Sequence, residues 1–496
     1  MSDSDSLLSR FIGGTISVGL GTLSVMVLGL LGMMVAARYL TAEALGAFVL
    51  LRVVAFFFTQ VSSFGLDLSM AKFITSTEDD RHKRKLINTV IYFRLFTICV
   101  VSLVALIVMP ALSTLFGSSL SSDLAVFVPL LFLLQSSRRL LRSILQGFLL
   151  FKRLGRGDLI ASVSNLILMV LFVLLLDRGL IGLVYARVIS LSLACAFEYY
   201  CIPTKKQFEF HLDILKEALA FGFPLQINDI LGFAFGRIDT LIIGALLGPA
   251  DIAYYEIARK IPDSFAQLYE AFRAVYFPFV ARLFARGEQK KAARVLNNST
   301  RLISFASLLG TLVALLFGSD IISLLFSERY LPSVSAFVLL MIVMSISRVG
   351  NILGTSLVAL GDSGKPAIIN TAHTAVSLVS NLILIPAFGI VGAALASLAG
   401  TSAANPLNVL FLRRRKVDVR ASDYLKPILV FGAFLLLALL LKPTTFLQKA
   451  LVVLLFLFSC RFLSVITGDD LAALSREVKL VLFKLRRSVR SGGTKT

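Results

Sequence analysis

Long, unbroken apolar segments constrain this chain more than any other feature. Segments of about 20 mostly apolar residues, the length that a helix needs to cross a bilayer, recur from residue 11 to residue 466. The strands of a membrane barrel would instead alternate apolar and polar residues over about 10 positions. Only 16% of the 496 residues are charged, against about 25% in soluble domains. We therefore predict an all-α polytopic membrane protein and exclude a soluble enzyme, a coiled coil and a disordered chain.

The apolar segments predict about fourteen transmembrane helices. Four pairs of segments are joined so tightly that twelve helices are an alternative. Either even number places both termini on one side of the membrane. The predicted spans are residues 11–36, 46–66, 88–109, 124–148, 159–177, 180–200, 219–247, 252–280, 300–318, 333–360, 366–386, 389–411, 427–441 and 445–466.

Positive charge is strongly biased toward one side of these spans. The net charge is +20. Loops and tails on the side of the termini carry 31 Lys and Arg residues, whereas the opposite side carries five: Arg38, Arg178, Arg329, Lys442 and Lys449. Cytoplasmic loops of membrane proteins are enriched in Lys and Arg, so we expect both termini in the cytoplasm. The same bias accounts for the basic composition without a nucleic-acid partner.

The end of the chain, from Leu471 to Arg490, combines apolar residues at helical spacing with basic residues on other faces. This pattern fits a helix that lies on anionic lipid. The alternative is a basic tail that only sets the orientation of the chain.

Two sequence echoes indicate an internal repeat. Residues 38–48 resemble residues 245–255 at an offset of 207, which aligns Arg52 with Arg259. Residues 177–182 resemble residues 387–392 at an offset of 210. Parallel repeats occur in transporters, with the substrate path between the halves. We predict two six-helix lobes related by a parallel pseudo-two-fold repeat, 1–218 and 219–411, followed by a segment, 412–496, with two further helices and the basic tail.

Charged residues inside the predicted spans are the candidate functional residues, because an intramembrane charge usually faces a cavity or a partner. Span 252–280 carries a polar stripe at steps of three and four residues. One interpretation is a basic, water-filled cavity for an anion, since the planar fork of Arg suits phosphate. The alternative is a set of structural ion pairs, in which we expect Glu256 to pair with Lys260, and Arg237 with Asp239. The candidate substrate-binding residues are Arg52, Arg237, Arg259, Lys260, Arg273 and Arg348, and the candidate ion-coupling or charge-balancing residues are Asp229, Asp239, Glu256, Asp263 and Glu270.

Other arginines lie within reach of the cytoplasmic interface, where a long side chain can extend its charge into water. We expect this snorkelling for Arg94, Arg139, Arg142, Arg301 and Arg461.

Several motifs of other protein classes are missing from the sequence. No G-x-x-x-x-G-K-[ST] string occurs, so the chain is not an ATPase of that class. The three histidines, His82, His211 and His373, are too dispersed for a metal cluster. No pair of carboxylates stands in an outer loop for glycosyl-transfer chemistry. We expect no catalytic residues, no metal and no cofactor.

Three motifs together resemble those of polysaccharide flippases. Residues Ala37 to Phe48 resemble the turn after the first span of these proteins. Arg237-Ile238-Asp239, followed by Ile242-Ile243-Gly244 and Tyr254-Tyr255, resembles the start of their second half. Residues Ser380 to Pro386, followed by Gly389 and Gly392-Ala393-Ala394, resemble a further signature. Over residues 10 to 412 the chain is similar to the multidrug/oligosaccharidyl-lipid/polysaccharide (MOP) exporter superfamily, in its Wzx-type oligosaccharide flippase branch.

The resemblance implies two lobes around a V-shaped central cavity and alternating access without ATP. The implied cargo is an undecaprenyl diphosphate-linked oligosaccharide, moved from the cytoplasmic to the outer leaflet of the bacterial inner membrane for surface polysaccharide (O-antigen or exopolysaccharide) synthesis. The implied partners are glycosyltransferases and the polymerase of the same pathway, the chain itself being a monomer. By position, Arg52 and Arg259 take the cavity-lining role. A proton gradient, a sodium gradient or the membrane potential would drive transport.

Three other functions remain as alternatives. A lipid II flippase is a close relative of the predicted type. A drug or cation antiporter of the same superfamily would favour an acidic cavity, whereas the intramembrane charge here is basic. A polymerase or ligase would normally carry a large outer loop, whereas no predicted outer loop is much longer than a dozen residues.

Overall fold

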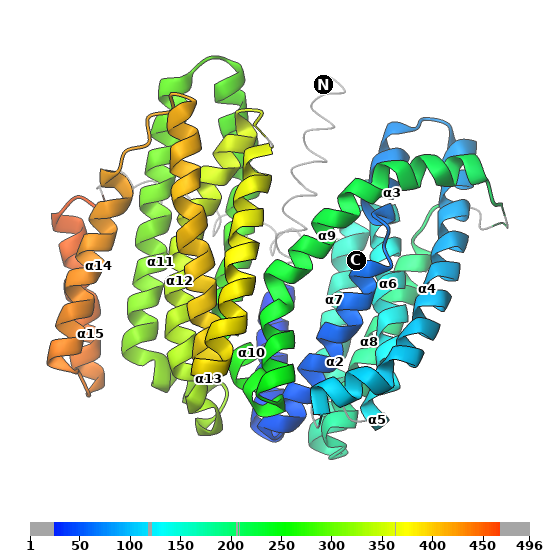
Figure 1. The fold of residues 1–496 in the computed structure, drawn as a ribbon, viewed down its shortest axis with the longest axis horizontal. Helices are drawn as coiled ribbons and strands as arrows, with labels where there is room; N and C mark the ends of the chain where they lie inside the picture. The colour runs from blue at the N-terminus through cyan, green and yellow to red at the C-terminus, as the bar shows by residue number, and fades with distance from the viewer. Residues whose placement is uncertain (1–23, 118–121, 205–206, 208, 363, 467–496) are drawn as a thin grey trace, which may run out of the picture. The chain divides into compact units, whose positions relative to one another are not determined.

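The structure is a computed structural model that describes the chain except for residues 1–23, 118–121, 205–206, 208, 363 and 467–496. The described residues are helical and contain no strand, which confirms the all-α prediction (Figure 1). The predicted amphipathic tail, Leu471 to Arg490, lies outside the described residues.

Helices occupy the described parts of the predicted spans, of which the first, 11–36, is described only from residue 24. Eight of the described helices are long and apolar enough to cross a membrane, while the count of fourteen crossings stays a prediction. In chain order the helices are Ser24–Tyr39, α2 (Ala42–Val61), α3 (Leu66–Ser76), α4 (Asp80–Phe116), α5 (Ser122–Ala125), α6 (Phe127–Gly147), α7 (Phe151–Met169), the π-helical turn η2 (Val170–Leu175), α8 (Gly179–Tyr200), α9 (Leu212–Leu246), α10 (Pro249–Ala285), α11 (Gln289–Leu325), the 3₁₀ turn η3 (Glu328–Ser333), α12 (Val334–Ala359), α13 (Gly364–Arg414), α14 (Ser422–Leu441) and α15 (Phe446–Phe462).

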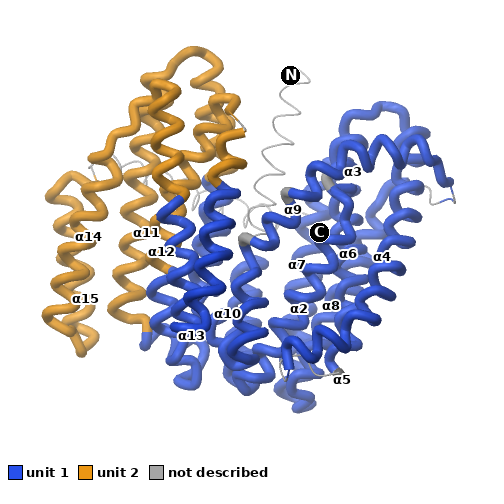
Figure 2. Tube along the Cα trace, viewed as in Figure 1, with its two compact units in different colours: residues 1–272, 319–340, 370–403 blue, residues 273–318, 341–369, 404–496 orange. Residues whose placement is uncertain are grey.

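The chain divides into two compact units, shown in two colours in Figure 2. Unit 1 comprises residues 1–272, 319–340 and 370–403, and unit 2 comprises residues 273–318, 341–369 and 404–496. The two-lobe arrangement and its central cavity stay predictions.

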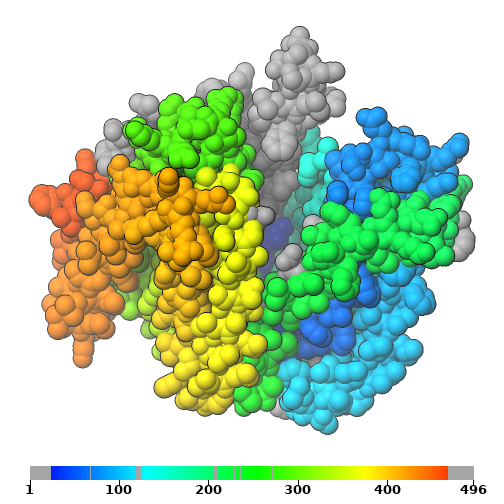
Figure 3. All heavy atoms as spheres, turned by 45° about the horizontal axis from the view of Figure 1, so that its top comes forward, coloured from blue at the N-terminus to red at the C-terminus, as the bar shows by residue number. Residues whose placement is uncertain are grey.

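The core of unit 1 lies between α3, α4 and α6. Buried apolar side chains from the three helices pack together there, including Leu66, Met70, Val90 and Ile144. Helix α9 packs along α2, α3 and α4, and Figure 3 shows it lying across this part of unit 1. This packing places the charged residues of α9 against α2, α3 and α6.

In unit 2 a second core joins α11 to α14 and α15. Leu308, Leu312 and Leu316 follow one another at intervals of four, so they form one face of α11, and this face packs against Phe431 and Phe456. The outer faces of α14 and α15 expose large apolar residues. Such an apolar surface suits contact with acyl chains rather than water.

The glycines of the second echo explain why it is visible in the sequence. Gly179, the first residue of α8, has φ +53°, and Gly389, within α13, has φ +59°. This left-handed conformation favours glycine over residues with a Cβ. At Gly389 the chain turns between two helices of α13, which match the predicted spans 366–386 and 389–411. The two helices lie side by side, because His373 and Thr401 are 3.3 Å apart and a Cβ on Gly392 would lie 1.9 Å from the Leu384 carbonyl oxygen.

Close backbone contact in unit 1 depends on Gly46 and Gly65. A Cβ on Gly46 would lie 1.6 Å from the carbonyl oxygen of Pro249, and one on Gly65 would lie 1.8 Å from that of Gly222. By contrast, a Cβ on Gly232 or Gly236 would meet no described atom within 4 Å. Gly232 and Gly236 of α9 therefore do not mark a close helix contact, whereas Gly244 does, because its Cβ would lie 3.0 Å from Ile252 and 3.4 Å from Leu50.

Candidate functional site

Seven charged residues of α2, α9 and α10 form a cluster inside unit 1, which we call the cationic cluster. Helices α9 and α10 are consecutive and joined by a tight turn at Gly248, whose φ is +124°. The turn brings the end of α9 against the start of α10, and α2 packs beside α9. Four cations therefore face three carboxylates. The members are Arg52, Arg237, Asp239, Glu256, Arg259, Lys260 and Asp263.

The ion pairs of the cluster run between α9 and α10. Arg237 Nη1 lies 3.0 Å from Glu256 Oε2. Arg259 lies 3.4 Å from Asp239 of α9 and 3.2 Å from Asp263, one turn further along α10. Tyr255 donates a 2.6 Å hydrogen bond to Asp239.

These pairings differ from the expected ones. The sequence predicts Glu256 with Lys260 and Arg237 with Asp239, whereas the structure pairs Glu256 with Arg237 and Asp239 with Arg259. The expected pairs are local in sequence. The observed cross-helix pairs result from the α9–α10 turn, which places residues about 20 positions apart opposite one another.

Arg52 and Lys260 are the least neutralised cations of the cluster. Within the part of the chain that the structure describes, neither forms an ion pair. The Arg52 guanidinium lies 5.7 Å from the centre of the Phe48 ring, a cation–π contact, and interacts electrostatically with Glu256 and Arg237. The Lys260 amine approaches Gly29 of the first helix.

The other predicted site residues lie outside this cluster. Asp229, on α9, forms a 2.5 Å ion pair with Arg139 of α6. Glu270 lies on the exposed part of α10 in unit 1. Arg273 and Arg348 belong to unit 2, on α10 and α12.

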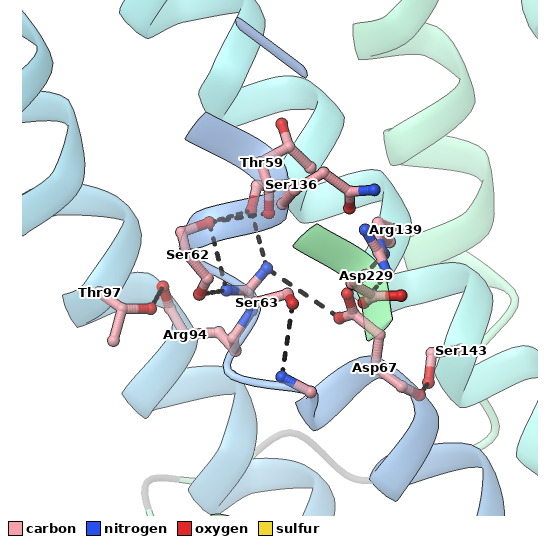
Figure 4. A network of polar contacts seen from close by, with 12 residues as sticks. Thr59, Ser62, Ser63, Asp67, Arg94, Thr97, Ser136, Arg139, Ser143 and Asp229 are labelled. Carbon is pink, nitrogen blue, oxygen red and sulfur yellow. Dashed lines mark hydrogen bonds and ion pairs between the residues drawn. The ribbon is translucent and has the colours of Figure 1, made fainter. Parts of the chain in front are cut away.

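A second polar network, shown in Figure 4, surrounds the break between α2 and α3. Phe64 and Gly65 have positive φ here, and α3 begins at Leu66. The freed backbone groups have partners on other helices. The Ser62 carbonyl accepts a hydrogen bond from Arg94 of α4, and the Gly65 N–H donates one of 2.9 Å to Gln226 of α9. Irregular backbone at membrane depth is tolerated where protein satisfies it in this way.

The arginines of this network do not snorkel. Arg94 is fully buried, donates to Ser136 Oγ at 2.8 Å and lies 4.0 Å from Asp67. Arg139 binds Asp67 at 2.7 Å and Asp229 at 2.5 Å. The snorkelling prediction was wrong for both arginines, because it judged each by its distance from the interface. The carboxylates of α3 and α9 were the signal that sequence reasoning missed.

Helix α6 carries two further arginines that face carboxylates of α7 and α8. Arg138 lies 2.9 Å from Asp158 and 3.0 Å from Glu198. Arg142, one turn along, also pairs with Asp158, and its snorkelling stays a prediction. Glu198 is fully buried and reaches this position because α7 has no side chain at Gly157, where a Cβ would lie 2.6 Å from Glu198 Oε1.

Comparison with known proteins places the chain in a family. Residues 35–335 match the family described as "Polysaccharide biosynthesis protein". The "Probable low-salt glycan biosynthesis flippase Agl15" of Haloferax volcanii is 25% identical over 381 residues, covering 74% of this chain and 76% of that protein.

Solved structures share the fold. The "Lipid II flippase MurJ, inward closed conformation" superposes with a TM-score of 0.73 at 18% identity, covering 89% of this chain and 98% of that one. An inward-facing multidrug resistance MATE family transporter of the MOP superfamily gives 0.65 at 17% identity, covering 80% and 98%.

Proposed function

Since the chain belongs to the polysaccharide biosynthesis protein family, within the MOP superfamily of exporters, we propose that it is a flippase for a lipid-linked oligosaccharide. The cargo is a sugar unit on undecaprenyl diphosphate, which the chain moves from the cytoplasmic to the outer leaflet of the bacterial inner membrane. The transported unit is used for surface polysaccharide synthesis, with the glycosyltransferases and polymerase of the pathway as partners.

The cationic cluster is the observation that carries this proposal. A diphosphate needs concentrated positive charge away from bulk water, and arginine binds phosphate oxygens through two parallel N–H groups. Arg52 and Lys260 offer charge that no described carboxylate pairs with directly. Arg259 already holds Asp239 and Asp263, so in our proposal it helps to bind the diphosphate while also holding α9 against α10.

The carboxylates of the cluster have two roles in the proposal. Glu256, Asp239 and Asp263 limit the positive charge while the site is empty. Exchange of an ion pair for a proton or a sodium ion would link the gradient to movement of the cargo, without ATP hydrolysis. Asp229 and Glu270 are further candidates for this coupling.

The alternatives are separated by their cargo. A lipid II flippase is favoured by the fold similarity at a TM-score of 0.73, and it would be needed for the cell wall rather than for a surface polymer. A drug or cation antiporter would resemble the multidrug resistance MATE family transporter, which shares the fold. The excess of cations in the cluster opposes binding of a cationic drug.

The test is transport in cells that lack this chain. We expect loss of surface polymer and accumulation of the lipid-linked sugar in the inner leaflet. Arg52→Ala should reproduce this loss at normal protein level, Arg52→Lys should restore part of the activity, and Arg178→Ala, in an exposed loop, should behave as wild type. Arg259→Ala needs a stability control, because it also breaks two ion pairs.

Two results would contradict the proposal. Full export by a stable Arg52→Ala variant would show that Arg52 does not bind the diphosphate. Normal polymer in cells that lack this chain and any redundant flippase, together with a defect in cell-wall synthesis or drug resistance, would favour an alternative cargo.

A further inference from the structure

A cavity of about 360 Å³ opens beside α6 within unit 1. This volume lies within the range of about 300–1,000 Å³ typical of small-molecule sites. Arginines from α6 and α8 line it, together with Gln135 and Gln146, whose amides can donate to and accept from sugar hydroxyl groups. The lining arginines are Arg138, Arg139, Arg142 and Arg187.

The cavity lies on the same face of α2 as Arg52. Its lining includes Phe56 and Thr59, four and seven residues after Arg52. These spacings share one helical face, and at a rise of about 1.5 Å per residue they place the cavity roughly 6–10 Å along α2 from Arg52. A group in the cavity would therefore be near a diphosphate bound at Arg52, but not in the same place.

The arginines around the cavity differ in how many carboxylates pair with them. Arg138 and Arg142 share Asp158 and Glu198. Arg139 is held by Asp67, which also lines the cavity, and by Asp229.

Arg187 of α8 has no such carboxylate among the described residues. Its Nε is buried without a hydrogen-bond partner, and the charges that act on it are those of Arg52 and Arg138. A partly buried cation beside two like charges costs free energy that a bound anion would offset.

We propose that this cavity is a second anion subsite, centred on Arg187, which binds a carboxylate or phosphate group on the sugar part of the cargo. The inference rests on the proposed function and narrows its substrate class to an acidic glycan. Arg52 takes the diphosphate, Arg187 takes the acidic sugar, and Gln135 and Gln146 bind neutral hydroxyl groups between charged contacts.

The first test is ligand-dependent thermal stability of the purified full-length protein in detergent. The probes are glucuronate and glucose 6-phosphate, with glucose as the neutral control and inorganic pyrophosphate for the Arg52 site. Glucuronate or glucose 6-phosphate should raise the apparent melting temperature of the wild type and of Arg178→Gln, and glucose should not. The preferred probe identifies carboxylate or phosphate as the ligand group.

Two Arg187 variants distinguish a ligand-binding role from a structural one. Arg187→Gln should raise the half-saturating concentration of the acidic sugar at least tenfold, and Arg187→Lys should retain part of the response. Without ligand, Arg187→Gln should melt no lower than wild type, because it removes a partly buried charge that no described carboxylate neutralises. A ligand-free Arg187→Gln protein that melts well below wild type, or one that binds the acidic sugar as well as wild type, would overturn the proposal.

Failure of this subsite is distinguishable from failure of the proposed function. Protection by pyrophosphate should be lost in Arg52→Ala and kept in Arg187→Gln. If pyrophosphate protects in this pattern and neither acidic sugar protects the wild type, the second subsite is wrong and the diphosphate site stands. If pyrophosphate protection is instead lost in Arg187→Gln, the cavity belongs to the diphosphate site and is not a separate subsite.

Discussion

The ion pair between Arg237 and Glu256 can be removed from either side or from both, which tests whether it is structural. At 3.0 Å, Coulomb attraction between unit charges is about 5 kcal/mol at an effective dielectric constant of about 20. Desolvation cancels part of this attraction. The Glu256 side chain is only 9% exposed, whereas that of Arg237 is 26% exposed. The cost of Arg237→Gln or Glu256→Gln should therefore fall between that of an exposed pair, about 1 kcal/mol, and that of a fully buried one, about 3–5 kcal/mol.

The double variant separates the pair from its surroundings. Each single change leaves one charge unpaired in a low-dielectric site, whereas the double change leaves two neutral amides that can bond to each other. We expect single-variant losses of about 2–3 kcal/mol and a double variant more stable than either single variant. Glu256→Gln should be the more harmful single change, because it also leaves Arg52 and Lys260 without their nearest opposite charge.

The assay is unfolding of purified protein by SDS in mixed micelles, combined with polymer export in cells. Lys83 and Asp80 form the control pair, because Asp80 is 94% exposed and their coupling energy should be near zero. Additive losses in the Arg237→Gln/Glu256→Gln double variant would refute the structural pair. A stable double variant that exports polymer would remove Arg237 from the substrate-binding set, and a stable one that does not export would keep it there.

Three further substitutions test buried contacts within unit 1, each by the melting temperature of the purified protein. Gly65→Ala should prevent stable folding, because its Cβ would lie 1.8 Å from the Gly222 carbonyl oxygen at a φ of +68°; a melting temperature close to wild type would contradict that close contact. Arg94→Met should cost about 2–3 kcal/mol, because it leaves the Ser62 carbonyl buried without its donor and Asp67 with Arg139 as its remaining described cation, and a neutral effect would show that the buried network is not needed. Gly157→Ala should lower stability by about 1–3 kcal/mol by displacing the buried carboxylate of Glu198; an unchanged protein would mean that α7 moves to make room.

The helices were predictable from the sequence because membrane helices are specified locally. A run of about 20 apolar residues specifies a span whatever its neighbours are. Gly179 and Gly389 mark positions where the backbone is left-handed, a conformation that favours glycine. The two spans within α13 were predictable for the same reason, because Gly389 takes the left-handed conformation at the turn between them.

The partners of the charged residues were much less predictable than the charges themselves. Arg94 looked close enough to the interface to reach water, yet it is fully buried. Arg94 is buried because Asp67 and Ser136, which lie on two other helices, supply its partners. Sequence spacing along one helix favours pairs at three and four residues, so it led to Glu256 with Lys260 and missed the pairs that join α9 to α10.

The break between α2 and α3 imposes an order on the assembly of the protein. Its backbone groups emerge from the ribosome with α2, but their partners arrive later, Arg94 on α4 and Gln226 more than 160 residues downstream on α9. Until α9 is inserted, the Gly65 N–H has the Ser63 hydroxyl, at 3.4 Å, or water as its partner, because lipid offers none. A nascent chain that stalls before residue 226 therefore displays an unpaired backbone segment, which gives membrane quality control a signal to recognise incomplete molecules.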